Sequence, residues 1–98
     1  MVRQIVWDLD ARNYLRNAIK YIREDSPKNA DLVKTKIFES IRKIPANPYK
    51  HPADKFKQPA DEHVRAYELL HFRISYQVTE AQIRILRIRH TSMEPLLF

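Results

Sequence analysis

The sequence of 98 residues contains no glycine and no cysteine, and these two absences exclude several classes of protein. Glycine lets the backbone approach phosphate closely, so neither a P-loop nor a Rossmann dinucleotide-binding motif can be present. Without cysteine there is no disulfide framework, no thiolate zinc site and no cysteine nucleophile. Ordinary nucleotide-binding chemistry and thiol chemistry are both excluded.

Long apolar runs are also missing. No stretch approaches the roughly 20 residues that a membrane-spanning helix needs, and the first ten residues, MVRQIVWDLD, lack the apolar core of a secretory signal. We therefore expect a cytoplasmic protein with no membrane partner. The length predicts a single domain over residues 1–98, because half this length would hold too small a core.

Positive charge is in excess. Lysine and arginine number 18 against 12 acidic residues, which gives a formal net charge of +6. Such an excess favours an anionic partner, either nucleic acid or an acidic protein. The four histidines are separated by 12, 8 and 19 residues, a spacing that matches no metal-ligand motif. We expect neither a metal nor a cofactor.

Hydrophobic periodicity predicts a strand and two helices in the first half. Residues 3–7 are typical of a short strand. Asp8 or Asp10 then caps a helix whose apolar stripe runs to Ile22. Ser26 as N-cap and Pro27 at the first helical position begin a second helix, and its pattern ends at Pro45. The short link predicts an antiparallel helical hairpin.

Residues 45–63 lose this periodicity, and the prolines in the segment forbid a helix of useful length. These are Pro45, Pro48, Pro52 and Pro59. A long irregular segment is unusual in so small a domain. It either has a function of its own or wraps the edge of the sheet, and the sequence leaves both open.

The last third predicts three antiparallel strands, at 64–70, 72–78 and 82–90. The middle one alternates apolar and polar residues with a period of two. In the last one the phase slips after Ile85, so this strand is either central, with both faces covered, or bulged near Ile85. The predicted fold is α+β in the order β-α-α-β-β-β, with the helical hairpin on one face of the sheet.

Five arginines lie on predicted strands: Arg65, Arg73, Arg84, Arg87 and Arg89. If the helical hairpin covers only the apolar face, arginines on the free polar face form a concave basic surface. Guanidinium groups pair well with phosphate and carboxylate, so this surface suits RNA, DNA or an acidic protein segment. The alternative is a structural role in cross-strand ion pairs with Glu68, Glu80 and Glu94.

Catalytic patterns are sparse. No Ser-His-Asp arrangement and no carboxylate pair at catalytic spacing is legible. His90, at the end of the last strand beside Arg89, is either a general base or a surface imidazole. An enzyme with this sequence would have to work with arginine, lysine and histidine.

The order of elements, the FRISYQV strand at 72–78 and the RILRIRHTSME ending at 84–94 resemble the RelE/ParE superfamily of bacterial toxins. The resemblance covers nearly the whole chain. It implies a type II toxin that a cognate antitoxin wraps and neutralises, in a higher-order toxin–antitoxin complex. The RelE-like branch cleaves messenger RNA on the ribosome with basic residues around the scissile phosphate. The ParE-like branch binds and poisons DNA gyrase without chemistry of its own.

The nuclease branch would assign catalytic roles to Arg65, Arg73 and His90. Two departures weigh against it. Thr91 stands where many nucleases have arginine, and the tail ends in Phe98 rather than a tyrosine that could donate a hydrogen bond. The HTSME ending resembles the ParE branch. We therefore predict a gyrase inhibitor, with a ribosome-dependent endoribonuclease as the alternative and another basic adaptor as the third reading.

The tail at residues 91–98 places apolar side chains next to strand arginines. Interfaces concentrate binding energy in such aromatic and arginine anchors. The predicted target-binding residues are Arg87, Arg89, Met93, Leu96 and Phe98. The alternative is a tail that packs on its own sheet and protects an edge.

Overall fold

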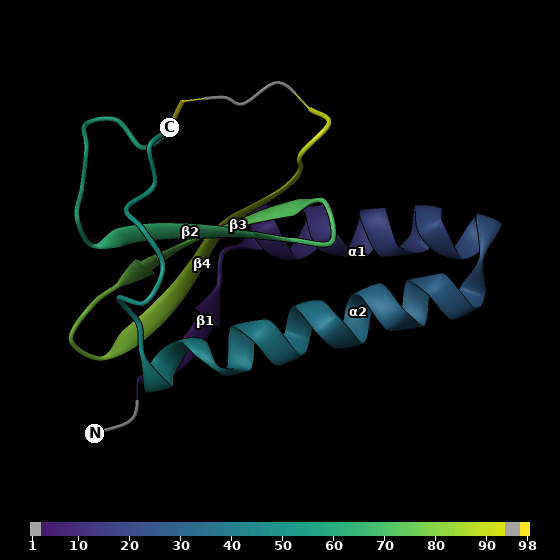
Figure 1. Ribbon diagram of the computed structural model, residues 1–98, viewed down its shortest axis with the longest axis horizontal. Helices are drawn as coiled ribbons and strands as arrows, with labels where there is room; N and C mark the ends of the chain where they lie inside the picture. The colour runs from purple at the N-terminus through teal and green to yellow at the C-terminus, as the bar shows by residue number, and fades with distance from the viewer. Residues whose placement is uncertain (1–2, 94–96) are drawn as a thin grey trace.

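The computed structural model describes residues 3–93 and 97–98, which form one sheet with a helical hairpin packed on one face (Figure 1). This arrangement confirms the predicted α+β order. The elements are β1 (Gln4–Trp7), α1 (Leu9–Asp25), α2 (Pro27–Arg42), a short 3₁₀ helix η1 (Ile44–Ala46), β2 (Val64–Leu69), β3 (Phe72–Val78) and β4 (Gln82–His90).

The helix boundaries follow the expected local signals. Ser26 caps α2, since its hydroxyl accepts a hydrogen bond of 3.1 Å from the N–H of Asn29, and Pro27 takes the first helical position. Asp8 occupies the N-cap position of α1 but makes no side-chain cap bond; its carboxylate pairs with Arg84 on β4. The first helix is therefore tied to the sheet at its start.

The sheet has four strands in the order β1-β4-β3-β2. β2–β3 and β3–β4 pair antiparallel, as the sequence predicts. β1 adds a strand that the predicted three-stranded sheet did not include, because it pairs in parallel with the beginning of β4, with Gln4 opposite Gln82. β4 is therefore a central strand.

The phase slip in β4 is a β-bulge. Ser75 lies opposite Arg87 and Tyr76 opposite Ile85, which leaves Leu86 as the extra residue. The strand is therefore both central and bulged, the two alternatives that the sequence left open. The bulge keeps Ile85 on the helix side while it turns Arg87 to the other side, called here the outer face.

The core lies between the helices and the sheet. Its buried members are Ala11, Leu15, Val33, Ile37, Ile41, Ile44, Phe72, Ile74, Tyr76, Val78, Ile83, Ile85 and Ile88. Two tyrosines carry polar groups into this region. Tyr76 donates a hydrogen bond of 2.7 Å to the carbonyl of Pro48, and the Tyr67 hydroxyl lies 2.7 Å from that of Ser40. Burial raises the pKa of each phenol to about 12.

The expectation of a free polar face was wrong, because the 45–63 segment covers part of it. The Asp54 N–H donates to the carbonyl of Val64 at 2.8 Å, and the Ala66 N–H donates to Pro52 at 3.1 Å. These bonds attach the segment to the edge strand β2. Val64 and Ala66 present small apolar side chains on the outer face, and covering them removes apolar surface from water.

The β2–β3 connection is a two-residue turn of Leu70 and His71. Both residues have positive φ, 51° and 67°. The strand therefore ends at Leu69, one residue earlier than the sequence pattern indicates.

Candidate functional site

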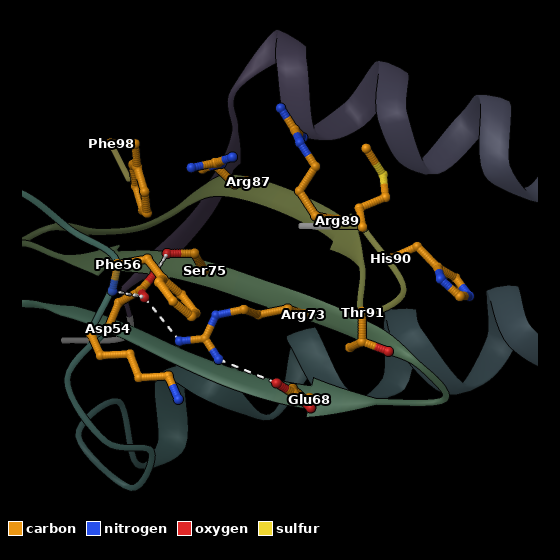
Figure 2. Close-up of a pocket in the computed structure, with 12 residues that line it drawn as sticks. Asp54, Phe56, Glu68, Arg73, Ser75, Arg87, Arg89, His90, Thr91 and Phe98 are labelled. Atoms are coloured by element: carbon orange, nitrogen blue, oxygen red, sulfur yellow. Dashed lines mark hydrogen bonds and ion pairs between the residues drawn. The ribbon is translucent and has the colours of Figure 1, made fainter. Parts of the chain in front are cut away.

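A cavity of about 250 Å³ lies on the outer face of the sheet, between the 45–63 segment and the end of β4 (Figure 2). Its lining combines charged and apolar side chains. The lining residues are Asp54, Lys55, Phe56, Glu68, Arg73, Ser75, Arg87, Arg89, His90, Thr91, Met93 and Phe98. We call this the outer-face cavity.

Asp54 is the buried anion of the cavity and is only 4% exposed. Its carboxylate accepts hydrogen bonds from the Ser75 hydroxyl (2.5 Å), from Arg73 (2.9 Å) and from the N–H of Phe56 (3.0 Å). Burial alone would raise the pKa of Asp54. The hydrogen bonds and the positive charge of Arg73 outweigh burial and hold this pKa below its ordinary value. The carboxyl is therefore an anion at neutral pH.

Arg73 is already neutralised within the protein. Besides Asp54 it reaches Glu68 at 3.4 Å, which is the cross-strand ion pair that the sequence offered as an alternative. Its guanidinium also lies 4.7 Å from the ring centroid of Phe56. An arginine held by two carboxylates and one aromatic ring has little free charge to offer a ligand.

Phe98 forms one wall of the cavity. The guanidinium of Arg87 lies 4.5 Å from its ring centroid. The main chain of Phe98 is anchored at the same place, since its N–H donates to Phe56 at 3.0 Å and its oxygen accepts from the N–H of Gln58 at 2.5 Å. Figure 1 shows this end of the chain beside the 45–63 segment. Leu97, by contrast, is 59% exposed.

The beginning of α1 holds the opposite wall. Arg89 pairs with Asp10 at 2.8 Å and lies over the ring of Tyr14, 4.8 Å from its centroid. The Tyr14 hydroxyl accepts from the N–H of His90 at 3.0 Å and donates to the sulfur of Met93 at 2.8 Å. These contacts fix the end of β4 while Met93 stays 48% exposed.

The three residues that the nuclease reading would require do not all come together. Arg65 lies opposite Tyr76 and therefore on the helix-covered side of the sheet, where it donates to the carbonyls of Glu62 and His51. The His90 ring contacts Phe72 edge-on, and in Figure 2 it points away from Arg73. Its Nδ1 accepts from the Ser92 N–H at 3.1 Å. Arg73 and His90 both line the outer-face cavity, whereas Arg65 does not.

The predicted target-binding residues fall mostly in one place. Arg87, Arg89, Met93 and Phe98 all line the outer-face cavity. Leu96, the fifth, lies outside the described residues. Of the five strand arginines, Arg73, Arg87 and Arg89 line the cavity, whereas Arg65 lies on the other face and Arg84 pairs with Asp8.

Sequence reasoning missed Asp54, Ser75 and Phe56. Asp54 and Phe56 come from the aperiodic segment, where no repeat indicates which side chain meets the sheet. Ser75 is 3% exposed, although its position in the alternating strand predicted a free polar residue. The nearest signal is that an acid and an aromatic lie two residues apart in an otherwise basic stretch.

A second concave surface lies on the helical hairpin. It is a groove of about 570 Å³ with an apolar floor and a cationic rim. The floor is Trp7, Leu15, Ile19 and Phe38, and the rim is Arg12, Arg16 and Lys34. The rim cations make no ion pair with any acid in the part of the chain that the structure describes. We call this the hairpin groove.

Within residues 3–93 and 97–98, no group of three or more histidine, aspartate or glutamate side chains is arranged to hold a metal ion. No helix in the same residues is long and apolar enough to cross a membrane.

Comparison with known proteins identifies the family. The family described as "ParE toxin of type II toxin-antitoxin system, parDE" matches residues 5–95. The chain therefore belongs to the ParE toxin family, within the RelE/ParE superfamily. It is the toxin component of a bacterial type II toxin–antitoxin system, and its partner is a cognate antitoxin.

The fold agrees with this assignment. A solved structure described as the chromosomal ParDE toxin–antitoxin system from P. aeruginosa superposes with a TM-score of 0.70 at 20% sequence identity. The match covers 91% of this chain and 96% of that chain. A comparison with curated proteins finds no match.

Proposed function

We propose that this toxin acts by binding and poisoning DNA gyrase in the cytoplasm, without catalysing a reaction of its own. The observation that carries the proposal is the buried carboxylate of Asp54, which lines the outer-face cavity and pairs with Arg73. Membership of the ParE family supports the same target.

The chemistry of RNA cleavage explains why Asp54 decides the question. Attack of a ribose 2′-OH on a phosphate builds up negative charge that must be stabilised by cations, and it needs a general base within hydrogen-bond reach. Here the central arginine, Arg73, is neutralised by Asp54 and Glu68. A fixed anion beside the reacting phosphate would repel the transition state. Arg65 lies on the other face of the sheet, and the His90 ring, although it lines the same cavity, points away from Arg73 (Figure 2).

The rim of the cavity is better suited to holding a protein. Arg87 and Arg89 supply guanidinium groups, of which that of Arg89 pairs with the exposed Asp10, and Met93 and Phe98 supply apolar surface within the same cavity. Binding energy at protein interfaces concentrates in such arginine and aromatic anchors. We therefore assign contact with the target to these four residues.

The antitoxin would use the hairpin groove. Its apolar floor suits the apolar face of an amphipathic helix, and its three cations, which pair with no acid among the described residues, suit carboxylates on the same helix. An acidic antitoxin segment in this groove leaves the outer-face cavity uncovered. Neutralisation and target binding then depend on different residues.

Induction of the toxin in bacteria tests the proposed function. We expect a DNA-damage response with intact messenger RNA, and an unchanged effect when His90 is replaced in His90→Ala. Rapid arrest of translation with cleaved messenger RNA would contradict the proposal and favour the ribosome-dependent nuclease. Normal growth on induction of folded protein would count against any toxic activity.

A further inference from the structure

The turn between β2 and β3 is built from residues that do not favour its backbone conformation. Leu70 and His71 are its two central residues, and both adopt positive φ, 51° and 67°. Two positive φ values in a two-residue hairpin are those of a type I′ turn. Such turns prefer Asn-Gly, because a left-handed backbone brings Cβ close to the following carbonyl oxygen in other L-residues.

Packing within the protein does not explain the leucine. A large apolar side chain can compensate for a strained backbone when it is buried, yet Leu70 is 40% exposed. A small polar residue would suit both the left-handed backbone and the contact with solvent better than leucine does. Strain that the fold does not need is found most often at functional sites.

The turn also has a fixed place beside the outer-face cavity. The carbonyl of His71 accepts a hydrogen bond of 2.7 Å from the N–H of Thr91, which itself lines the cavity. Figure 2 shows Thr91 near the closed end of the β2–β3 hairpin. Leu70 is therefore presented at the same end of the sheet as Met93, the exposed apolar residue of the cavity rim.

We propose that Leu70 is an apolar anchor for the toxin's target, held by a strained turn at the end of the outer-face cavity. This inference rests on the proposed function and extends its interface by one element. The partner is a surface of DNA gyrase with an apolar recess for Leu70, bordered by carboxylates that meet Arg87 and Arg89. The continuity of the turn with the cavity and the positive charge of its rim support this partner.

Two variants of the turn separate the side chain from the strain. Leu70→Asn removes the apolar anchor and relaxes the backbone, because asparagine tolerates the left-handed region. His71→Gly relaxes the backbone but keeps Leu70. Leu32→Ala is the matched control, an exposed leucine on α2. Each full-length variant is compared with wild type in melting temperature, inhibition of purified gyrase, antitoxin affinity and growth arrest.

We expect Leu70→Asn to raise the melting temperature by roughly 4–8 °C through relief of strain. It should weaken gyrase inhibition at least about tenfold with little change in antitoxin affinity. His71→Gly should raise the melting temperature and keep inhibition within about threefold of wild type. Leu32→Ala should inhibit like wild type. Because the key variant gains stability, its loss of inhibition could not come from misfolding.

Leu70→Asn protein that inhibits gyrase as strongly as wild type would overturn the proposal. So would a loss confined to antitoxin affinity, which would assign the turn to the antitoxin. If wild-type toxin has no effect on gyrase, the proposed function fails separately. Growth arrest by Leu70→Asn then separates two cases. Full arrest would exclude Leu70 as an anchor, whereas lost arrest would keep Leu70 as the anchor for a different target.

Discussion

Arg73 donates a hydrogen bond of 2.9 Å to the carboxylate of Asp54, and this pair joins the irregular 45–63 segment to the central strand β3. The same carboxylate accepts the hydroxyl hydrogen of Ser75. One acidic residue therefore attaches a loop to the sheet and also neutralises the cation on which a nuclease of this fold would depend. Its importance to stability and its effect on function can be measured separately.

Removal of the Asp54 carboxylate should destabilise the protein. In Asp54→Ala the Arg73 guanidinium stays partly buried without its main partner, which should lower the free energy of unfolding by about 2–3 kcal/mol. Asp10→Ala is the matched control, because it breaks the exposed pair with Arg89 and should cost within about 1 kcal/mol. Denaturant unfolding measures both. Equal losses in the two variants would contradict the role assigned to Asp54.

The same residue predicts how stability depends on acid. The pKa of Asp54 is lower in the folded protein than the value of about 3.9 expected in the unfolded chain, so the unfolded chain binds the proton first as pH falls. Its contribution to stability is fully present above about pH 4 and is lost as pH falls through the folded pKa. The free energy of unfolding, measured across that pH range, should change less with pH for Asp54→Asn than for wild type. Identical slopes for the variant and wild type would count against this assignment.

Local patterns in the sequence predicted the elements but not all of their pairings. The alternation over 72–78 and the Ser26-Pro27 cap are signals within a few residues, and both are confirmed. The parallel pairing of β1 with β4 joins Gln4 to Gln82. Contacts so distant in sequence leave no local pattern, because any short apolar strand could occupy that edge.

The site was less predictable for the same reason. Strand arginines were visible in the sequence, but their faces depend on the bulge at Leu86 and on the cover given by Asp54 and Phe56. The Leu70-His71 turn was missed because turn prediction relies on glycine and asparagine, which are absent there. Each miss concerns a tertiary contact that overrides a local preference.

The stability of the protein at alkaline pH should depend on the two buried phenols. Tyr67 and Tyr76 have pKa values of about 12 in the folded protein, against about 10 in an unfolded chain. The unfolded chain therefore loses these protons first. Their contribution is fully present below about pH 10 and is lost as pH rises towards about 12. Absorbance titration of tyrosinate measures these pKa values. Tyr67→Phe and Tyr76→Phe should each remove one group that ionises late. Ionisation of both phenols near pH 10 in the folded protein would contradict the prediction.

Charge reversal in the hairpin groove should separate neutralisation from toxicity. Arg12→Glu with Arg16→Glu should weaken antitoxin affinity at least about tenfold, because like charges then face an acidic segment. Growth arrest by the toxin alone should persist, and co-expressed antitoxin should no longer rescue growth. Lys20→Glu with Lys28→Glu makes the same charge change outside the groove and should remain neutralised. Unaltered affinity in the groove variant would place the antitoxin elsewhere.

Truncation of side chains on the cavity rim should do the reverse: it should weaken the action on the target and leave antitoxin affinity unchanged. Arg87→Ala and Phe98→Ala should each weaken gyrase inhibition at least about tenfold. Phe98 is half-buried, so its loss should cost about 1 kcal/mol of stability. Tyr21→Ala removes an exposed aromatic ring on α1 and serves as the control. If Phe98→Ala instead lowers stability and antitoxin affinity together while inhibition persists, the tail has only a structural role.

The central claim, that this toxin binds and poisons gyrase and does not cut RNA, is tested most directly with purified components. Wild-type toxin is added to gyrase with plasmid DNA, and in parallel to translating ribosomes with messenger RNA. The account predicts inhibited supercoiling with accumulation of cleaved DNA, weakened by Arg87→Ala, and messenger RNA left intact. Unaffected gyrase together with messenger RNA cut on the ribosome, and lost in His90→Ala, would contradict it.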